Sequence, residues 1–422
     1  MLGLTLWGAL TLASALLGAA AFVHRASSRE PDRFVARVLI LGFVGKLAAS
    51  GIYYFFLTGV YEGGDSFLYV RVGEQIAEQL RSGGGVPDTA WDTGTRSMEF
   101  ISGVVYALTQ PTVLHGFLLF ALLAYYGAYL ALRGFSIAFP EGDRRRYALL
   151  IMLTPTMLFW PSSISKDSWL VFGLGAGIYG VARVYRRMTG GYVVFLVATA
   201  AIYLVRPHMA ALFALAAAIG FSLRLRDEGV RRGATAWILG MVVVSSGAGY
   251  ALATYDEFLP QDENVQGTTL DQVLGAVERQ TARGGSEFAS RPVETPLDLG
   301  YAVVTVPFRP FPHETSNLQA MLASLEGLVL LGLFVLSFRR LRKLPQLLLR
   351  RPFVAFATAY SLGFIVAFAN VGNFGILARQ RTQLLPLFLV LLCLPPVGKT
   401  VRKRKQPPLA RAGSTPTSAQ RP

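Results

Sequence analysis

Residues 113–137 read VLHGFLLFALLAYYGAYLALRGFSI, an apolar run that contains a single arginine. A helix needs about 20 apolar residues to cross the hydrocarbon core of a bilayer, so this run is long enough to do so. Other apolar runs meet that length or come close to it: 3–23, 38–60, 147–162, 168–183, 191–206, 209–223, 234–254, 318–337, 353–371 and 380–397. The sequence therefore predicts an all-α, polytopic integral membrane protein, a helical bundle with about 11 transmembrane helices.

Composition favours the same class of protein. Of the 422 residues, 53% are hydrophobic and 15% are charged, and the mean hydropathy is +0.44, which a soluble domain would not tolerate on its surface. The formal net charge of +15 comes from short Arg and Lys clusters between apolar runs, so we expect a lipid bilayer and no nucleic acid as partner. The single cysteine, Cys393, excludes a disulfide framework and a cysteine-based metal site.

Arginine-rich short segments set the expected orientation: 25–37, 144–146, 183–187, 224–232 and 339–351. Such segments stay on the cytoplasmic side of the membrane, which places the N-terminus outside. We expect residues 1–397 to form the transmembrane domain and residues 398–422 to form a disordered, basic cytoplasmic tail. The bias toward Ala, Gly, Leu, Val and Arg favours a bacterial plasma (inner) membrane, with the run 3–23 as a retained helix rather than a cleaved signal peptide.

Two longer loops, 61–98 and 255–317, face outward under this orientation and are acidic on balance. The apolar stretch 98–110 is too short to cross comfortably, and we interpret it as an interfacial or re-entrant helix. The stretch 299–307 is left uncrossed for the same reason. Both outer loops are therefore expected to contain surface helices and to offer places where a soluble substrate could bind.

Asp65 begins a predicted amphipathic surface helix in the first outer loop. Leu68, Val72 and Ile76 recur there at helical spacing, and the glycines at 83–85 end the pattern. Asp65 could cap this helix. Alternatively, it is a general base for a sugar hydroxyl, because that role needs a carboxylate at the water boundary beside a lipid-borne donor.

The outer turn 159–169, FWPSSISKDSW, places Lys166 and Asp167 next to the hydrocarbon. In one interpretation it is a plain hairpin, with Ser163 or Ser165 as helix cap and with Lys166 paired to Asp167. Charges at this depth are costly without a partner, so the functional interpretation is a site in which Lys166 binds phosphate.

Further polar groups occur at outer turns. Arg206 and His208 flank Pro207 in a turn with no room for a loop, where a snorkelling arginine is the alternative explanation. In the segment 307–314, PFRPFPHE, the prolines favour a rigid, extended backbone beside Arg309, His313 and Glu314 rather than a regular helix. A simple stop signal for the helix is the competing explanation.

The segment 370–375, NVGNFG, turns the chain outside and contains Asn373. Arg379 and Arg381 then begin the last helix, against the positive-inside rule. Their spacing puts them on different sides of a helix, so we expect that they contact different partners or that only one of them faces the site. Lys166, Arg206, Arg309, Arg379 and Arg381 all fall on the outer side, as the phosphate of a lipid-linked ligand would require.

These motifs resemble bacterial polytopic membrane proteins of the GT-C-like glycosyltransferase and exopolysaccharide repeat-unit polymerase group. The resemblance covers most of residues 38–397. It rests on several motifs: Gly64-Asp65-Ser66 with Tyr69, Trp160-Pro161-Ser162-Ser163 with Lys166-Asp167, Arg206-Pro207-His208, Gly284-Gly285-Ser286, Arg309-Pro310-Phe311-Pro312 with Glu314, and Asn373-Phe374-Gly375 with Arg379-Gln380-Arg381. It implies a GT-C-like fold and a glycosyl transfer reaction, with Tyr69 among the substrate contacts.

The function that we expect is glycosyl transfer or polysaccharide polymerisation on the extracytoplasmic face, from a polyprenyl-phosphate- or pyrophosphate-linked sugar donor to a glycan acceptor. The expected catalytic residues are Asp65, His208, His313 and Glu314. The expected substrate-binding residues are Tyr69, Lys166, Asp167, Arg206, Arg309, Asn373, Arg379 and Arg381. No cofactor is indicated, because the first outer loop lacks the Asp-x-Asp or Glu-x-Asp pair of many metal-using GT-C enzymes. The alternatives are a multi-pass transporter or lipid-linked glycan flippase, and a non-catalytic envelope assembly protein.

Overall fold

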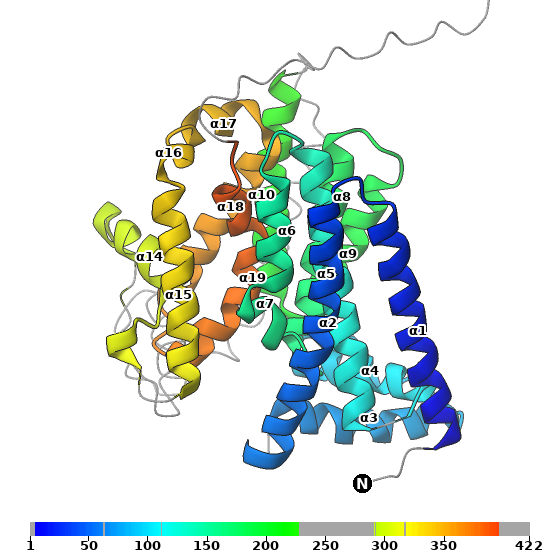
Figure 1. The fold of residues 1–422 in the computed structure, drawn as a ribbon. Helices are drawn as coiled ribbons and strands as arrows, with labels where there is room; N and C mark the ends of the chain where they lie inside the picture. Colours follow the sequence, from blue (N-terminus) through cyan, green and yellow to red (C-terminus); the bar gives the residue numbers. More distant parts are fainter. Residues whose placement is uncertain are drawn as a thin grey trace, which may run out of the picture.

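The structure is a computed structural model that describes residues 5–61, 64–110, 112–227, 291, 293–315 and 318–395. These residues form 16 α-helices and no sheet, which confirms the predicted all-α class. Most of the helices stand side by side as an upright bundle (Figure 1). They are α1 (Leu6–Ser28), α2 (Arg33–Phe56), α5 (Val113–Ala138), α6 (Arg144–Leu153), α7 (Pro155–Phe159), α8 (Lys166–Tyr185), α9 (Gly191–Val205), α10 (Pro207–Asp227), α15 (Leu318–Leu336), α18 (Pro352–Phe368) and α19 (Phe374–Leu392).

Shorter helices cover the two ends of the bundle. Helices α3 (Asp65–Arg81) and α4 (Thr95–Leu108) lie across one end, at the bottom of Figure 1. Helices α16 (Phe338–Leu341) and α17 (Leu344–Arg350) lie at the opposite end, and α14 (Pro296–Phe308) lies beside α15. A π-helical turn, Leu57–Tyr61, follows α2, and two 3-10 turns, Asp88–Trp91 and Pro312–Glu314, precede α4 and α15.

Among the described residues, three helical stretches are long and apolar enough to cross a membrane: α1, Arg33–Gly59 and α5. A fourth is counted if α17 and α18, which are bent by 118° relative to one another, form one span. Helices occupy all the predicted apolar segments within the described residues. The predicted segment 234–254 and the predicted tail 398–422 lie outside the residues that the structure describes.

The segment 147–162 was predicted as one helix, but the structure breaks it in two. Helix α6 ends at Leu153, and α7 begins at Pro155 after Thr154 adopts an extended conformation with ψ 129°. Proline has no N–H to donate, and it forces the preceding residue out of the helical region, which explains the break. The remaining turn, α7, is held by charged side chains of two neighbouring helices.

Lys46 of α2 and Glu326 of α15 bind opposite ends of α7. The Lys46 ammonium is buried and donates to the carbonyl oxygens of Met157, at 2.7 Å, and Leu158, at 3.3 Å. Glu326 accepts from the N–H of Thr156 at 3.0 Å and from its hydroxyl at 2.7 Å. Each group satisfies backbone atoms that a short helix leaves unpaired, so both side chains support the break.

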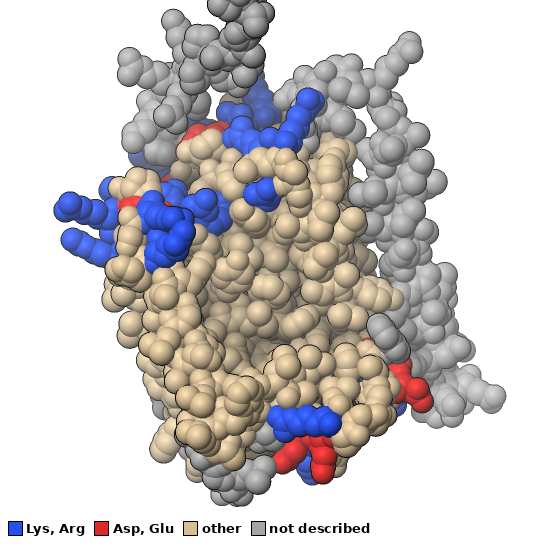
Figure 2. Space-filling model, turned by 90° about the vertical axis from the view of Figure 1, so that its right-hand side faces the viewer, with Lys and Arg blue, Asp and Glu red and all other residues tan. Residues whose placement is uncertain are grey.

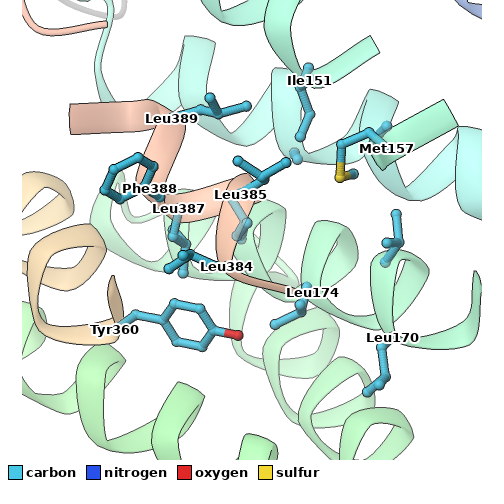
Figure 3. Close-up of a cluster of buried hydrophobic side chains, with 14 of the residues drawn as sticks. Ile151, Met157, Leu170, Leu174, Tyr360, Leu384, Leu385, Leu387, Phe388 and Leu389 are labelled. Carbon is cyan, nitrogen blue, oxygen red and sulfur yellow. The ribbon is translucent and has the colours of Figure 1, made fainter. Parts of the chain in front are cut away.

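The centre of the bundle is apolar and closely packed. Figure 3 shows buried side chains of α6, α7, α8, α18 and α19 in one cluster. Helices α5 and α8 approach so closely that a Cβ at Gly175 would lie 1.9 Å from the carbonyl oxygen of Gly127. Small residues at such crossings let helix backbones pack without side-chain clashes, as is common between membrane helices.

A helix is present where the surface helix was predicted, as α3, and the stretch 98–110 falls within α4 and the residues that follow it. Gly64, not Asp65, is the N-cap of α3 and has a φ of +124°, which favours glycine. Ser66 donates to the carbonyl oxygen of Ile164 at 2.8 Å, which attaches α3 to the turn before α8. The pair α3 and α4 thus forms a platform beside the N-terminus of α8.

Candidate functional site

Arg379 of α19 is the centre of a charged cluster at the end of the bundle that α3 and α4 cover. Its Nε donates to Oδ2 of Asp167 in α8, and its Nη1 lies 3.8 Å from Oδ2 of Asp65 in α3. The cluster joins residues that are far apart in sequence at one place. We call Asp65, Lys166, Asp167, Arg206 and Arg379 the Arg379 cluster.

Asp65 and Asp167 have different environments within the Arg379 cluster. The Asp65 side chain is 62% exposed, whereas that of Asp167 is 1% exposed beneath Arg379. The second carboxylate oxygen of Asp167 is buried and has no hydrogen-bond partner in the described part of the chain. Asp167 therefore fixes Arg379, while Asp65 faces solvent and is free to meet a substrate.

Lys166, the first residue of α8, does not pair with Asp167. Ser165 is the N-cap of α8, and its hydroxyl accepts from the Ser168 N–H at 3.3 Å. Lys166 is therefore at the N-terminal end of the helix. The Lys166 ammonium donates to the hydroxyl of Thr95 in α4 at 2.9 Å. The alternative of a Lys166–Asp167 pair is wrong because successive residues on a helix point in different directions.

Arg206 lies in the one-residue turn between α9 and α10, where its side chain reaches α19. Its guanidinium donates to the side-chain oxygens of Gln380 and, at 3.3 Å, Gln383. Gln380 also accepts from the amide of Gln383, which fixes its oxygen toward Arg206. Both partners are neutral, so these hydrogen bonds orient the guanidinium without neutralising its charge.

Two cations in the Arg379 cluster therefore have no carboxylate partner among the described residues: Lys166 and Arg206. The two are close enough for their charges to interact. Buried or half-buried cations are usually paired with carboxylates. The arrangement therefore suits an anion that contacts these two side chains.

His208, in the first turn of α10, lies beside the same cations. Its side chain is exposed, and both Arg206 and Lys166 act on it electrostatically. Tyr69, in contrast, is buried, with an exposed fraction of 1%. It therefore offers a substrate little contact surface.

Arg309 and Glu314 form a second pair, beside α14. Arg309 Nη2 lies 2.7 Å from Glu314 Oε1, and its guanidinium lies over the rings of Tyr301 and Phe374 at 5.8 Å and 5.7 Å. A small pocket opens beside this pair. It is lined by Arg291, Tyr301, Thr305, Val306, Arg309, Phe368, Ala369, Val371 and Leu377.

Arg381 connects this second pair to α19. It is buried and donates through Nη2 to the carbonyl oxygen of Arg309, while Arg379 faces the other cluster. The prediction that Arg379 and Arg381 have different partners is therefore confirmed. The expected extended backbone begins later than predicted, because Pro307 lies inside the last turn of α14.

Two predicted site residues have other positions. His313 is exposed and stacks on Phe311 with ring centroids 6.0 Å apart. Asn373 is the N-cap of α19, and its side chain accepts from the N–H of Ile376 at 3.1 Å. Its hydrogen bond to the helix gives Asn373 a structural role at the turn that starts α19.

Thr95, Gln380 and Gln383 also belong to the site, and the sequence did not predict them. Gln380 lies between Arg379 and Arg381 in a motif that was singled out, so its position was the available signal. Thr95 has no local pattern around it, and only the tertiary fold brings this first residue of α4 to Lys166.

The Arg379 cluster lies at one end of the bundle, and most exposed Lys and Arg side chains lie at the other, as Figure 2 shows for one face. Within the described ranges, no group of three or more His, Cys, Asp or Glu residues could hold a metal ion. No protein-family model, curated protein or solved structure matches the chain. The described residues form an all-α protein with apolar helices of membrane-crossing length and a cluster of charged side chains at one end.

Proposed function

We propose that the chain is a multi-pass glycosyltransferase or polysaccharide polymerase of the plasma membrane, with its site on the extracytoplasmic face. Its donor is a sugar linked to polyprenyl phosphate or pyrophosphate, and its acceptor is a glycan. The observation that carries the proposal is that two cations without an ion-pair partner among the described residues, Lys166 and Arg206, belong to the same cluster as Arg379 and the exposed carboxylate of Asp65. Cations suit the leaving phosphate, and the carboxylate suits the attacking hydroxyl.

The reaction follows from this division of charge. An acceptor hydroxyl oxygen forms a bond to the anomeric carbon of the donor sugar, and the bond from that carbon to the phosphate oxygen breaks. The electron pair of the broken bond leaves with the polyprenyl phosphate or pyrophosphate, whose charge Lys166 and Arg206 stabilise. The hydroxyl proton passes to the Asp65 carboxylate, with His208 as the alternative base beside the same cations.

The proposed orientation places α3, α4 and the Arg379 cluster outside and the arginine-rich turns in the cytoplasm. The gathering of Lys and Arg at the end opposite to the cluster supports it, because short cytoplasmic loops are enriched in these residues. We further propose about 11 crossings and a GT-C-like arrangement, in which the N-terminus is outside. Short helices such as α9 and α10 would then cross with their ends completed by neighbouring helices.

A transporter or lipid-linked glycan flippase is the second candidate, because Glu326 places a buried carboxylate within the bundle. One Glu326 oxygen caps α7, which gives the residue a structural role, and the other has no hydrogen-bond partner in the described part of the chain. Coupling residues of transporters lie at such positions. A non-catalytic assembly protein is the third candidate, and it requires neither Asp65 nor Arg206.

The test is turnover by purified protein reconstituted in lipid. The protein is incubated with extracts of polyprenyl-linked sugars, and mass spectrometry follows elongated glycan and released polyprenyl phosphate. We expect the wild type to form both products and Asp65→Asn to form neither, with unchanged thermal stability. Wild-type protein that moves the lipid-linked sugar across the bilayer without releasing polyprenyl phosphate would support the transporter instead.

A further inference from the structure

The α16–α17 segment forms an elbow across the end of the bundle opposite to the Arg379 cluster (Figure 1). We define this elbow as residues 336–351. Helix α15 ends at Leu336, two short helices follow, and the chain then bends by 118° between α17 and α18. A segment in this position lies along the interface of a membrane that the bundle spans, rather than inside its hydrocarbon core.

Two arginines of the elbow attach it to the turn between α5 and α6. Arg340 Nη1 lies 2.9 Å from Asp143 Oδ2 and also donates to the carbonyl oxygen of Leu394 at 3.1 Å. Arg351 Nε lies 2.5 Å from Glu141 Oε1. The charges of these two side chains are thus used inside the protein, and they fix the position of the elbow.

Three other arginines of the elbow point outward. Arg339, Arg342 and Arg350 are exposed, and no carboxylate of the described residues lies within ion-pair distance of them. The same elbow exposes large apolar side chains: Leu336 is 77% exposed, Phe338 55% and Leu349 65%. The Arg342 guanidinium lies over the Phe338 ring at 5.2 Å, so a cation and an apolar group share one surface.

We infer that the elbow binds anionic phospholipid headgroups of the adjacent leaflet. Exposed apolar side chains interleaved with unpaired arginines match an interface where acyl chains meet phosphodiesters. Arginine binds phosphate oxygens through a planar fork of N–H donors, which favours the phosphate region over water. The inner pair, Arg340 and Arg351, holds the surface in place, while the outer three arginines contact the lipid.

The test uses purified full-length protein in phosphatidylcholine vesicles that contain a minority of phosphatidylglycerol. After mild detergent extraction, mass spectrometry measures the phosphatidylglycerol that remains bound, relative to phosphatidylcholine. We expect the wild type to retain phosphatidylglycerol above its bulk fraction. The triple variant Arg339→Gln, Arg342→Gln, Arg350→Gln should lower that enrichment at least about threefold.

A matched triple variant controls for net charge. Arg29, Arg33 and Arg37 are exposed at the same end of the bundle, outside the elbow, and their change to Gln removes the same charge. The inference is supported if this control variant keeps the phosphatidylglycerol enrichment and the elbow variant loses it. Equal loss in both variants, or equal retention, overturns it.

Crosslinking of the wild-type protein gives a second readout, which does not depend on the folding of any variant. A photoactivatable phosphatidylglycerol should label peptides from residues 336–351 more than those from the turn between α1 and α2. Labelling that avoids the elbow overturns the inference. Binding of an acidic soluble protein to the elbow, with no preference of the elbow for anionic lipid, would also overturn it. Neither outcome depends on glycosyl transfer, so this inference and the proposed function fail separately.

Discussion

Asp167 and Arg379 lie 212 positions apart in the sequence and form the ion pair that joins α8 to α19. In this pair, the buried Asp167 carboxylate holds the Arg379 guanidinium in place. A second nitrogen of Arg379 is then directed at the exposed carboxylate of Asp65. The two aspartates are expected to respond differently to the same substitution.

Asp167→Asn should destabilise the folded protein by about 3 kcal/mol, because it leaves the Arg379 guanidinium half-buried without its carboxylate. Asp65→Asn should leave stability nearly unchanged, since Asp65 is largely exposed, and should reduce glycosyl transfer at least about 100-fold. Thermal unfolding in detergent and turnover in vesicles measure the two effects. Equal loss of stability in both variants would contradict the division of roles.

Gln380→Glu should weaken binding of a polyprenyl phosphate about tenfold, because a carboxylate beside Arg206 would neutralise the charge that the ligand needs. Gln383→Glu offers a weaker version of the same change, at the longer 3.3 Å contact. Gln380→Met is the companion variant, which removes the hydrogen bond and adds no charge. If the Glu and Met variants bind equally well, charge is not the property that Gln380 protects.

Glu326 tests the transporter alternative. Glu326→Gln keeps an oxygen that can accept from Thr156, so it should retain stability and turnover, whereas Glu326→Leu should cost about 1–3 kcal/mol by leaving the Thr156 donors unpaired. Unfolding measurements and turnover assays compare the two. Loss of function in the Gln variant at full stability would instead indicate that protonation and deprotonation of the Glu326 carboxyl group take part in transport.

The turn between α1 and α2 provides a pH-dependent contribution to stability. Arg145 donates a 2.6 Å hydrogen bond to Asp32 and holds the pKa of that carboxyl below its ordinary value. Because the folded-state pKa is the lower one, the pair stabilises the fold above the unfolded-state pKa, and the contribution is lost as the pH falls through the folded value. Asp32→Asn, which keeps the helix cap, should lower the melting temperature by about 1–2 °C at neutral pH and by less near pH 3.

A double-variant cycle separates the Asp32–Arg145 pair from other effects of the change. Arg145→Gln should lower the melting temperature at neutral pH as much as Asp32→Asn does, and the two changes together should add nothing. Strictly additive losses would show that the two residues do not interact.

The helices could be predicted from the sequence because each apolar run needs only its own residues to form a helix. The amphipathic pattern before Gly83 is likewise local, and it predicted α3. The break at Pro155 was not predicted, although proline favours a break, because the apolar run continues on both sides of it.

The partners within the site could not be predicted in the same way. Lys166 was paired with its neighbour Asp167 in one interpretation, yet the packing of α4 gives it Thr95 instead. The neutral partners of Arg206 come from α19, more than 170 positions later, and no local pattern announces them. Only helix packing decides which outer charges are paired inside the protein and which remain for a ligand.

Binding of the leaving group tests the central claim most directly. Purified protein in phosphatidylcholine nanodiscs is titrated with a polyprenyl phosphate, and native mass spectrometry measures the bound fraction for the wild type, Arg206→Gln, Lys166→Gln and Arg71→Gln. Arg71 is an exposed arginine of α3 at the same end of the bundle and serves as the matched control. We predict that the Arg206 and Lys166 variants each bind at least about tenfold more weakly, while Arg71→Gln binds as the wild type does. Equal affinity in all four proteins would contradict the assignment of the Arg379 cluster as the phosphate site.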